Sequence, residues 1–400
     1  MSTTTIAAGA TPPGQARRFA AALFLVSIVY GLHIAFLPLW LDARGLSVDQ
    51  IGYLLALPTA AVVVFNPLVC AYADRRQRIA ASFVASAVAV AITHLTMAFS
   101  PDIVTLFLAA GAMALARAPL LTLADALTLA MIARDPRIDY GRMRIWCSLA
   151  VLFVTGIGGF VVERMAPQNI IWLLVAGTGA GAAAALAFTP RDVDRPRAAP
   201  ADASAPLVLP DRTALVAVIA SAALTQASHA LIYAFGSLHW RESGASGGFI
   251  GLVWAIGVAA EILLFAVASR LAAQRRAPLF LTLGAGFAAA RWMLMALDPA
   301  GLPLMALATL HAGSFGATHL GSLFLMARLA PAEARARAQG WLSAATGLAL
   351  MAATAASGPL WRSLGPHAYW IMAAMAVAAM ALAMWAARRL AQPQSAGSGG

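Results

Sequence analysis

Long apolar stretches alternate with short polar segments along almost the whole chain. Each stretch has the roughly 20 predominantly apolar residues that an α-helix needs to cross the hydrocarbon core of a bilayer. Twelve such stretches are expected to span, at residues 19–40, 51–70, 79–99, 103–121, 145–162, 170–188, 213–235, 249–267, 278–297, 302–326, 338–360 and 368–387. The pattern predicts an all-α polytopic membrane protein with twelve transmembrane helices.

A polar segment divides these stretches into six and six. It contains five prolines and charges of both signs, which is typical of a linker. The expected organisation is an N-terminal cytoplasmic tail, a six-helix half, a cytoplasmic linker, a second six-helix half and a C-terminal tail, at residues 1–18, 19–188, 189–212, 213–387 and 388–400. Two such halves are the plan of secondary transporters built from repeats.

The composition supports a membrane protein and excludes other classes. Hydrophobic residues make up 61% of the 400 residues and charged residues only 11%, with a mean hydropathy of +0.80. A soluble domain would carry about 25% charged residues. The two cysteines, Cys70 and Cys147, are too few for a disulfide scaffold.

The basic residues predict the orientation in the membrane. All 27 are arginine, and with the N-terminus inside only four fall in outer gaps, namely Arg44, Arg164, Arg241 and Arg362. The positive-inside rule then places both termini in the cytoplasm, in a bacterial-type inner membrane, and no cleavable signal peptide is expected. The net charge of +11 does not indicate a nucleic-acid partner, because the arginines form short clusters between apolar stretches.

Charged and histidine side chains within the predicted spans are the candidate site residues, because each charge costs about 2.5–3.5 kcal/mol at mid-depth. They are His33, His94, Arg117, Asp125, His229, Glu261, Arg291, His311 and His319. Depths counted along the helices make Arg291 and His311 neighbours and place Glu261 between the depths of His311 and His319. We expect protonation of Glu261 to break a Glu261–Arg291 pair and free the arginine for a substrate.

Several of these residues have two interpretations. Arg291 is either a structural counter-charge for Glu261 or a substrate ligand. His94 is expected to hydrogen-bond between helices, whereas His33 and His229 occupy equivalent positions in the two halves and are expected to line the cavity. Asp125 lies either in the membrane or at its cytoplasmic mouth.

Motifs for other chemistry are missing from the sequence. It has no Gly-Lys-Ser/Thr phosphate loop, no His-Glu-x-x-His pair and no Gly-x-Ser-x-Gly elbow. We therefore expect no enzyme activity, no cofactor and no metal.

Residues 70–78 resemble the loop motif G-x-x-x-D-R-x-G-R of the major facilitator superfamily. Cys70 and Gln77 replace its two glycines, while Asp74, Arg75 and Arg78 match. The resemblance implies the major facilitator fold and a conformational gate on the cytoplasmic side, made of Asp74, Arg75 and Arg78 together with Arg144.

Further motifs resemble the phenylpropionic acid permease branch, a relative of lactose permease. Residues 140–148 resemble Y-G-x-x-R-x-W-G-S with Cys147 in place of glycine, and residues 254–261 match W-x-x-G-V-x-A-E. Tyr30-Gly31, Arg291-Trp292 and residues 310–319 complete the resemblance. The lactose permease trio of glutamate, arginine and histidine is similar to Glu261, Arg291 and His311, but its following glutamate is Ser314 here.

The expected function is proton-coupled symport of a small organic substrate, such as an aromatic carboxylate, by alternating access in a functional monomer. Proton coupling is assigned to Glu261, His311, His319 and Asp125. Substrate binding is assigned to Arg291, Arg117, His33, His229, Trp254 and Phe315. The alternatives are a sugar or nucleoside symporter, a drug or metabolite exporter, and a non-transporting membrane sensor.

Overall fold

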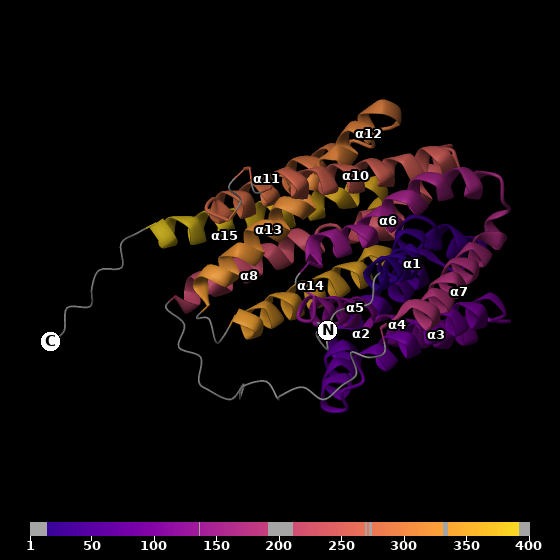
Figure 1. Ribbon diagram of the computed structural model, residues 1–400. Coiled ribbons are helices and arrows are strands. Elements are labelled where there is room, and N and C mark those ends of the chain that lie inside the picture. The colour runs from indigo at the N-terminus through magenta and orange to yellow at the C-terminus, as the bar shows by residue number, and fades with distance from the viewer. Residues whose placement is uncertain are drawn as a thin grey trace, which may run out of the picture. The chain divides into compact units, whose positions relative to one another are not determined.

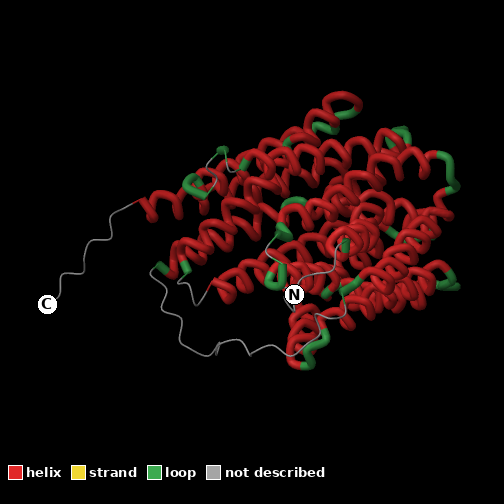
Figure 2. The backbone as a smooth tube through the Cα atoms, in the orientation of Figure 1, coloured by secondary structure: helices red, strands yellow, loops and turns green. Residues whose placement is uncertain are grey.

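The computed structural model describes residues 14–135, 137–190, 211–268, 270–271, 274–330 and 335–391, with side chains from residue 338 in the last range. Within these ranges every regular element is helical (Figures 1 and 2), which confirms the all-α expectation. Most of the expected linker and of both tails lies outside the described residues, at 191–210, 1–13 and 392–400.

Ten helical segments of the described chain are long and apolar enough to cross a membrane. The last of them, Ala338–Ala391, contains two helices, α14 and α15, separated by a short 3-10 turn. The expected span at 302–326 is not among the ten, so the count of twelve stays a prediction. That segment carries His311, His319 and several Ser, Thr and Gly residues, which lower its hydropathy.

The chain forms two compact units. The N-terminal unit comprises residues 1–46 and 57–200, and the C-terminal unit comprises residues 47–56 and 201–400. The first turns of α2 therefore group with the C-terminal unit, where a Cβ at Gly358 would lie 2.7 Å from the Asp49 Cα. Asp49 also forms an ion pair with Arg362 of α14.

In the N-terminal unit, α1 packs against α6 and α7, and α3 packs against α4 and α7. Its helices are α1 (Gln15–Ala43), α2 (Val48–Arg75), α3 (Ile79–Ala98), α4 (Ile103–Arg117), α5 (Leu120–Ile132), α6 (Tyr140–Glu163) and α7 (Ile170–Phe188). Asp102 begins α4 with a capping box to Thr105, and Asp139 caps α6. A Cβ at Gly181 would lie 3.1 Å from the Leu25 carbonyl, so α1 and α7 are in close contact.

The expected span at 103–121 is longer in the structure. Helices α4 and α5, interrupted at Ala118–Pro119, together cover Ile103–Ile132. The proline explains the interruption, because it has no N–H to donate within a helix. The helix continues past Asp125, whose charge is paired with Arg144.

In the C-terminal unit, α11 packs against α13 and α15, and α8 packs against α14 and α15. Its helices are α8 (Arg212–Ala227), α9 (Ser237–Glu242), α10 (Gly247–Val267), α11 (Ala277–Met295), α12 (Gly301–Thr309), α13 (Thr318–Leu329), α14 (Arg335–Leu364) and α15 (Tyr369–Ala391). Two π-helical segments lie between α-helices of this unit: η3 (Ile232–Gly236) between α8 and α9, and η4 (Ala312–Ala317) between α12 and α13. Short π-helical turns of this kind occur frequently at functional sites.

Candidate functional site

A line of polar side chains connects the helices of the C-terminal unit. Nη1 of Arg291 on α11 lies 3.3 Å from Nδ1 of His311 and 3.4 Å from Oγ of Ser314. Nε2 of His311 is 3.4 Å from a carboxylate oxygen of Glu261 on α10. Oγ of Ser314 is 3.0 Å from Nε2 of His229, which follows α8. These five side chains form one continuous polar chain.

The donors and acceptors in this chain can be assigned from the chemistry of the groups. Nδ1 of His229 lies 3.0 Å from the Thr225 carbonyl, which only accepts, so Nδ1 donates; in the neutral ring, Nε2 then accepts from Ser314. Arginine only donates, so Nδ1 of His311 accepts and its Nε2 donates toward Glu261. His311 is therefore neutral in this arrangement.

This geometry changes the expected relation between Glu261 and Arg291. They do not form the direct ion pair expected from their depths, because His311 lies between them. Depth along a helix does not define the direction in which a side chain points, and the π-helical turn that follows His311 is not visible in the sequence pattern. The carboxylate and the guanidinium are thus linked through one imidazole.

Close helix packing holds the chain together. A Cβ at Gly313 of η4 would lie 2.5 Å from ring atoms of Phe287 on α11, and one at Gly284 of α11 would collide with the Thr318 hydroxyl. Residues without a side chain at these two positions let η4 and α13 approach α11. Ser314 can therefore reach Arg291.

Aromatic rings surround the histidines. Phe315 stacks on His311, with ring centroids 5.1 Å apart and an interplanar angle of 21°, and on His319 at 6.4 Å and 10°. His319 also interacts electrostatically with Glu261. Trp292 lies 4.8 Å from the Arg291 guanidinium. The expected residues Phe315 and His319 thus lie beside the polar chain.

Trp254 belongs to the packing between α9 and α10. Its indole N–H donates to the Ser237 hydroxyl at 2.8 Å, and its ring lies 6.1 Å from Tyr233. Tyr233 in turn stacks on His229 at 5.7 Å. Sequence reasoning missed Tyr233 and the role of Ser314. The four-residue spacing of His229 and Tyr233, which places both on one helix face, could have indicated the tyrosine.

A second cluster lies within the N-terminal unit. The Nε2 atoms of His33 on α1 and His94 on α3 are 2.8 Å apart, and Nδ1 of His94 donates to the Val90 carbonyl at 2.7 Å. In the neutral ring of His94, Nε2 then accepts from His33. His94 joins two helices, as expected for it, and the pair is buried.

Arg117 lies at the end of α4, near this histidine pair. Its guanidinium carbon is 4.8 Å from the centroid of the Tyr30 ring on α1. Its Nε is buried and has no hydrogen-bond partner, as is also true of Nε of Arg291. No described carboxylate forms an ion pair with Arg117. It is therefore a half-buried cation without a carboxylate partner among the described residues.

Asp125 and Arg144 pair with each other, and both interact electrostatically with Tyr30, the residue on which Arg117 lies. Nη1 of Arg144 on α6 donates to the Asp125 carboxylate on α5 at 3.0 Å. Both side chains are about one third exposed, at 34% for Asp125 and 40% for Arg144. The pair connects α5 to the beginning of α6.

The residues of the expected gate motif lie at the end of α2 and are exposed. Within the described chain, no ion pair joins Asp74, Arg75 and Arg78 to one another or to a further residue. The turn is held by the Arg78 N–H, which donates to the Ala73 carbonyl at 2.8 Å. Gln77 has a φ of 51°, the left-handed conformation that the glycine of the motif adopts without strain.

Among the described residues, no group of three or more His, Cys, Asp and Glu side chains is placed to hold a metal ion. The two clusters contain guanidinium, imidazole and hydroxyl groups, and the first also contains the Glu261 carboxylate. Such groups can bind an anion and exchange a proton.

Comparison with known proteins gives consistent results. The model of the MFS_1 like family matches residues 17–372. A relative from Escherichia coli (strain K12), named a probable 3-phenylpropionic acid transporter, is 27% identical over 373 residues, which cover 92% of this chain and 96% of the relative.

Solved structures share the fold. The nucleoside transporter NupG has a TM-score of 0.76 at 16% identity, covering 95% of this chain and 100% of that chain. A POT family transporter in complex with a thioalcohol-conjugated peptide has a TM-score of 0.74 at 12% identity, covering 94% and 96%. At these identities the likeness concerns the fold alone.

Proposed function

The chain belongs to the MFS_1 like family of multi-pass membrane transporters, and from this premise we propose that it carries out proton-coupled symport of a small organic anion by alternating access. The proposed substrate is an aromatic carboxylate similar to 3-phenylpropionate. We place the transporter in a bacterial-type inner membrane, as a functional monomer with both termini in the cytoplasm.

The observation that carries the proposal is the chain from Glu261 through His311 to Arg291. Its carboxylate and guanidinium balance each other across one neutral imidazole. A proton taken up by Glu261 removes the negative charge and leaves Arg291 without compensation. Because a buried charge without a counter-charge is costly, the protonated site favours entry of an anion. Loss of the proton restores the negative charge of Glu261 and thereby favours release of the anion.

Arg117 supports an anionic substrate from the other unit. It is a half-buried cation without a carboxylate partner among the described residues, and its buried Nε is an unused donor. Arginine binds a carboxylate through two parallel hydrogen bonds, which suits a group of this charge and shape. The name of the Escherichia coli relative supports an aromatic acid in particular.

Uptake of labelled 3-phenylpropionate into proteoliposomes with an imposed pH gradient, acidic outside, tests the proposal. We expect uptake that collapses with a protonophore. Glu261→Gln should still exchange internal for external substrate but lose accumulation driven by the gradient. The matched control is Glu242→Gln, at an exposed glutamate at the end of α9, which should behave as wild type.

Two results would contradict the proposal. Accumulation that persists in the presence of the protonophore would exclude proton coupling. A folded, reconstituted protein that neither binds nor exchanges aromatic acids would exclude this substrate class, and nucleosides and sugars would be tested next.

A further inference from the structure

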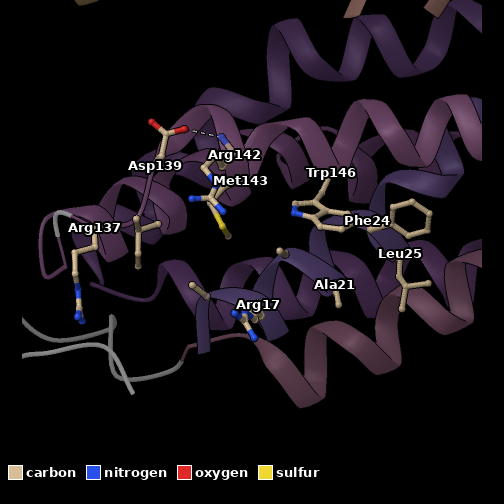
Figure 3. Close-up of a pocket in the computed structure, with 12 residues that line it drawn as sticks. Arg17, Ala21, Phe24, Leu25, Arg137, Asp139, Arg142, Met143 and Trp146 are labelled. Carbon is tan, nitrogen blue, oxygen red and sulfur yellow. Dashed lines mark hydrogen bonds between the residues drawn. The ribbon is translucent and has the colours of Figure 1, made fainter. Parts of the chain in front are cut away.

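A groove between α1 and α6 of the N-terminal unit is unused by the proposed transport mechanism. Its volume is about 670 Å³, and all of its lining residues lie in residues 16–25 and 137–146. Figure 3 shows its two ends: Arg17 and Arg142 lie toward one end, and the rings of Phe24 and Trp146 toward the other. The groove is therefore amphipathic along its length.

The polar end is positively charged. Arg17 comes from the first turn of α1 and Arg142 from the first turn of α6, and neither guanidinium has an ion-pair partner among the described residues. The carboxylate in the lining, Asp139, accepts the backbone N–H of Arg142 at 2.7 Å and caps α6. The third arginine, Arg137, is paired with Asp135 at 2.9 Å. Two cations are thus available to a ligand.

The apolar end has the chemistry of a hydrocarbon chain. Phe24 and Trp146 meet edge to face, with centroids 6.3 Å apart, and Met143 is buried beside them. Trp146 remains 42% exposed. Aromatic rings at one level and arginines about one or two helical turns away match the boundary between acyl chains and headgroups.

We propose that this groove holds one anionic phospholipid of the leaflet on the arginine-rich side, with its phosphate at Arg17 and Arg142 and an acyl chain along Phe24 and Trp146. Charge complementarity selects the occupant. The two unpaired guanidiniums match a phosphate, and the apolar floor matches a chain that a free phosphate lacks. Basic pockets between membrane helices on the cytoplasmic side are a known setting for such headgroups.

Quenching of Trp146 fluorescence by brominated acyl chains tests the proposal with the full chain in detergent. The contribution of Trp146 is the difference between wild type and Trp146→Phe, since the protein has ten tryptophans. Brominated phosphatidylglycerol should quench this contribution at lower concentration than brominated phosphatidylcholine. About 1 kcal/mol for each arginine near the headgroup corresponds to about a fivefold change in affinity. We therefore expect roughly 25-fold weaker phosphatidylglycerol binding in the Arg17→Gln, Arg142→Gln double variant.

Controls keep the test decisive. Arg75→Gln with Arg76→Gln removes two exposed arginines at the end of α2, outside the groove, and should leave the quenching unchanged. If the double variant fails to fold, Arg142→Lys replaces it in the test. This variant keeps the charge and should retain most of the preference for phosphatidylglycerol over phosphatidylcholine. Inorganic phosphate at millimolar concentration should not displace the lipid.

Three outcomes would overturn the proposal. Equal quenching by the two lipids would show that the groove does not select for charge. Unchanged binding in the folded double variant would remove the two arginines from the site. Displacement of the lipid by inorganic phosphate would identify a phosphate site in place of a lipid site.

Discussion

Each compact unit places one arginine beside histidines, buried for Arg291 and half-buried for Arg117, but the two arginines differ in their electrostatic partners. Arg291 is linked through His311 to Glu261. Arg117 lies over the Tyr30 ring and has no described carboxylate partner. Both guanidiniums are 4.8 Å from an aromatic ring and both leave Nε without an acceptor. The difference therefore lies in the counter-charge and not in the immediate packing.

This difference suggests a division of labour between the two units. A balanced pair responds to protonation, because one proton changes its net charge from zero to positive. An unbalanced arginine is already positive and favours an anion in every protonation state of Glu261. Within the proposed symport mechanism, Arg291 then belongs to coupling and Arg117 to substrate affinity.

The largest effect is expected from breaking the balanced pair. Arg291→Gln leaves the Glu261 carboxylate in a buried site without a counter-charge, which should destabilise the C-terminal unit by about 3–5 kcal/mol. Glu261→Gln should also destabilise, and the double variant should recover most of the loss. Thermal unfolding of the purified protein in detergent measures all three variants.

The control for this cycle is the exposed pair of Arg389 and Asp211, whose arginine side chain is 46% exposed. Arg389→Gln should cost at most about 1 kcal/mol, because solvent screens the interaction. If the loss of stability in the Glu261 and Arg291 double variant equals the sum of the losses in the two single variants, the two charges do not compensate each other across His311.

Arg117→Gln, unlike Arg291→Gln, should weaken substrate binding and leave the stability almost unchanged. It removes a half-buried charge that has no carboxylate partner among the described residues, so we expect little or no loss of stability. Substrate affinity should fall about 10- to 100-fold, because hydrogen bonds to charged groups contribute about 1.5–3 kcal/mol. Titration calorimetry with 3-phenylpropionate provides the measurement, and Arg117→Lys, which keeps the charge but not the planar fork, should lie between. Unchanged affinity in Arg117→Gln would contradict the assignment.

A smaller effect should separate the two histidine networks. His94→Ala leaves the His33 donor without its acceptor and should cost about 1–3 kcal/mol of stability, with transport per folded molecule unchanged. Ser314→Ala removes the link between Arg291 and His229 and should slow transport as well. Reconstituted uptake normalised to folded protein distinguishes them. Equal transport defects in both variants would remove the functional difference between the networks.

The sequence predicts the fold and the site residues to different extents. Apolar stretches of membrane-spanning length are sufficient for an all-α membrane protein, since the period and length of a helix are visible in the chain. The cost of a charge in hydrocarbon also identifies Arg117, Glu261 and Arg291 without a structure. What it does not reveal is how these side chains are connected.

That connection depends on features that leave no signal in the hydrophobic pattern. The π-helical turn at Ala312–Ala317 changes the direction of the residues after His311. Depth fixes a position along a helix axis but not the rotation about it, so it predicts that Arg291 and His311 are neighbours but not that His311 separates Arg291 from Glu261. The loop motif at residues 70–78 is a second example, because its sequence does not reveal the backbone conformation of Gln77. This residue keeps the left-handed conformation of the glycine that it replaces, at a cost of about 1–2 kcal/mol.

The smallest effect concerns the N-caps at which α4 and α8 begin, one in each unit. The Thr105 N–H holds the pKa of Asp102 below its ordinary value, and the Ala214 N–H together with Arg389 does the same for Asp211. A lowered folded-state pKa stabilises above the unfolded value of about 3.9, and the stabilisation is lost as the pH falls through the folded-state pKa. Asp211→Ala should therefore cost about 1 kcal/mol at pH 7 and less at pH 3, measured by thermal unfolding in detergent. Asp102 has no arginine partner among the described residues, so the loss in Asp102→Ala should not depend on salt, whereas the loss in Asp211→Ala should shrink at high salt. A loss in Asp211→Ala that is as large at pH 3 as at pH 7 would show that the carboxylate does not act through its charge.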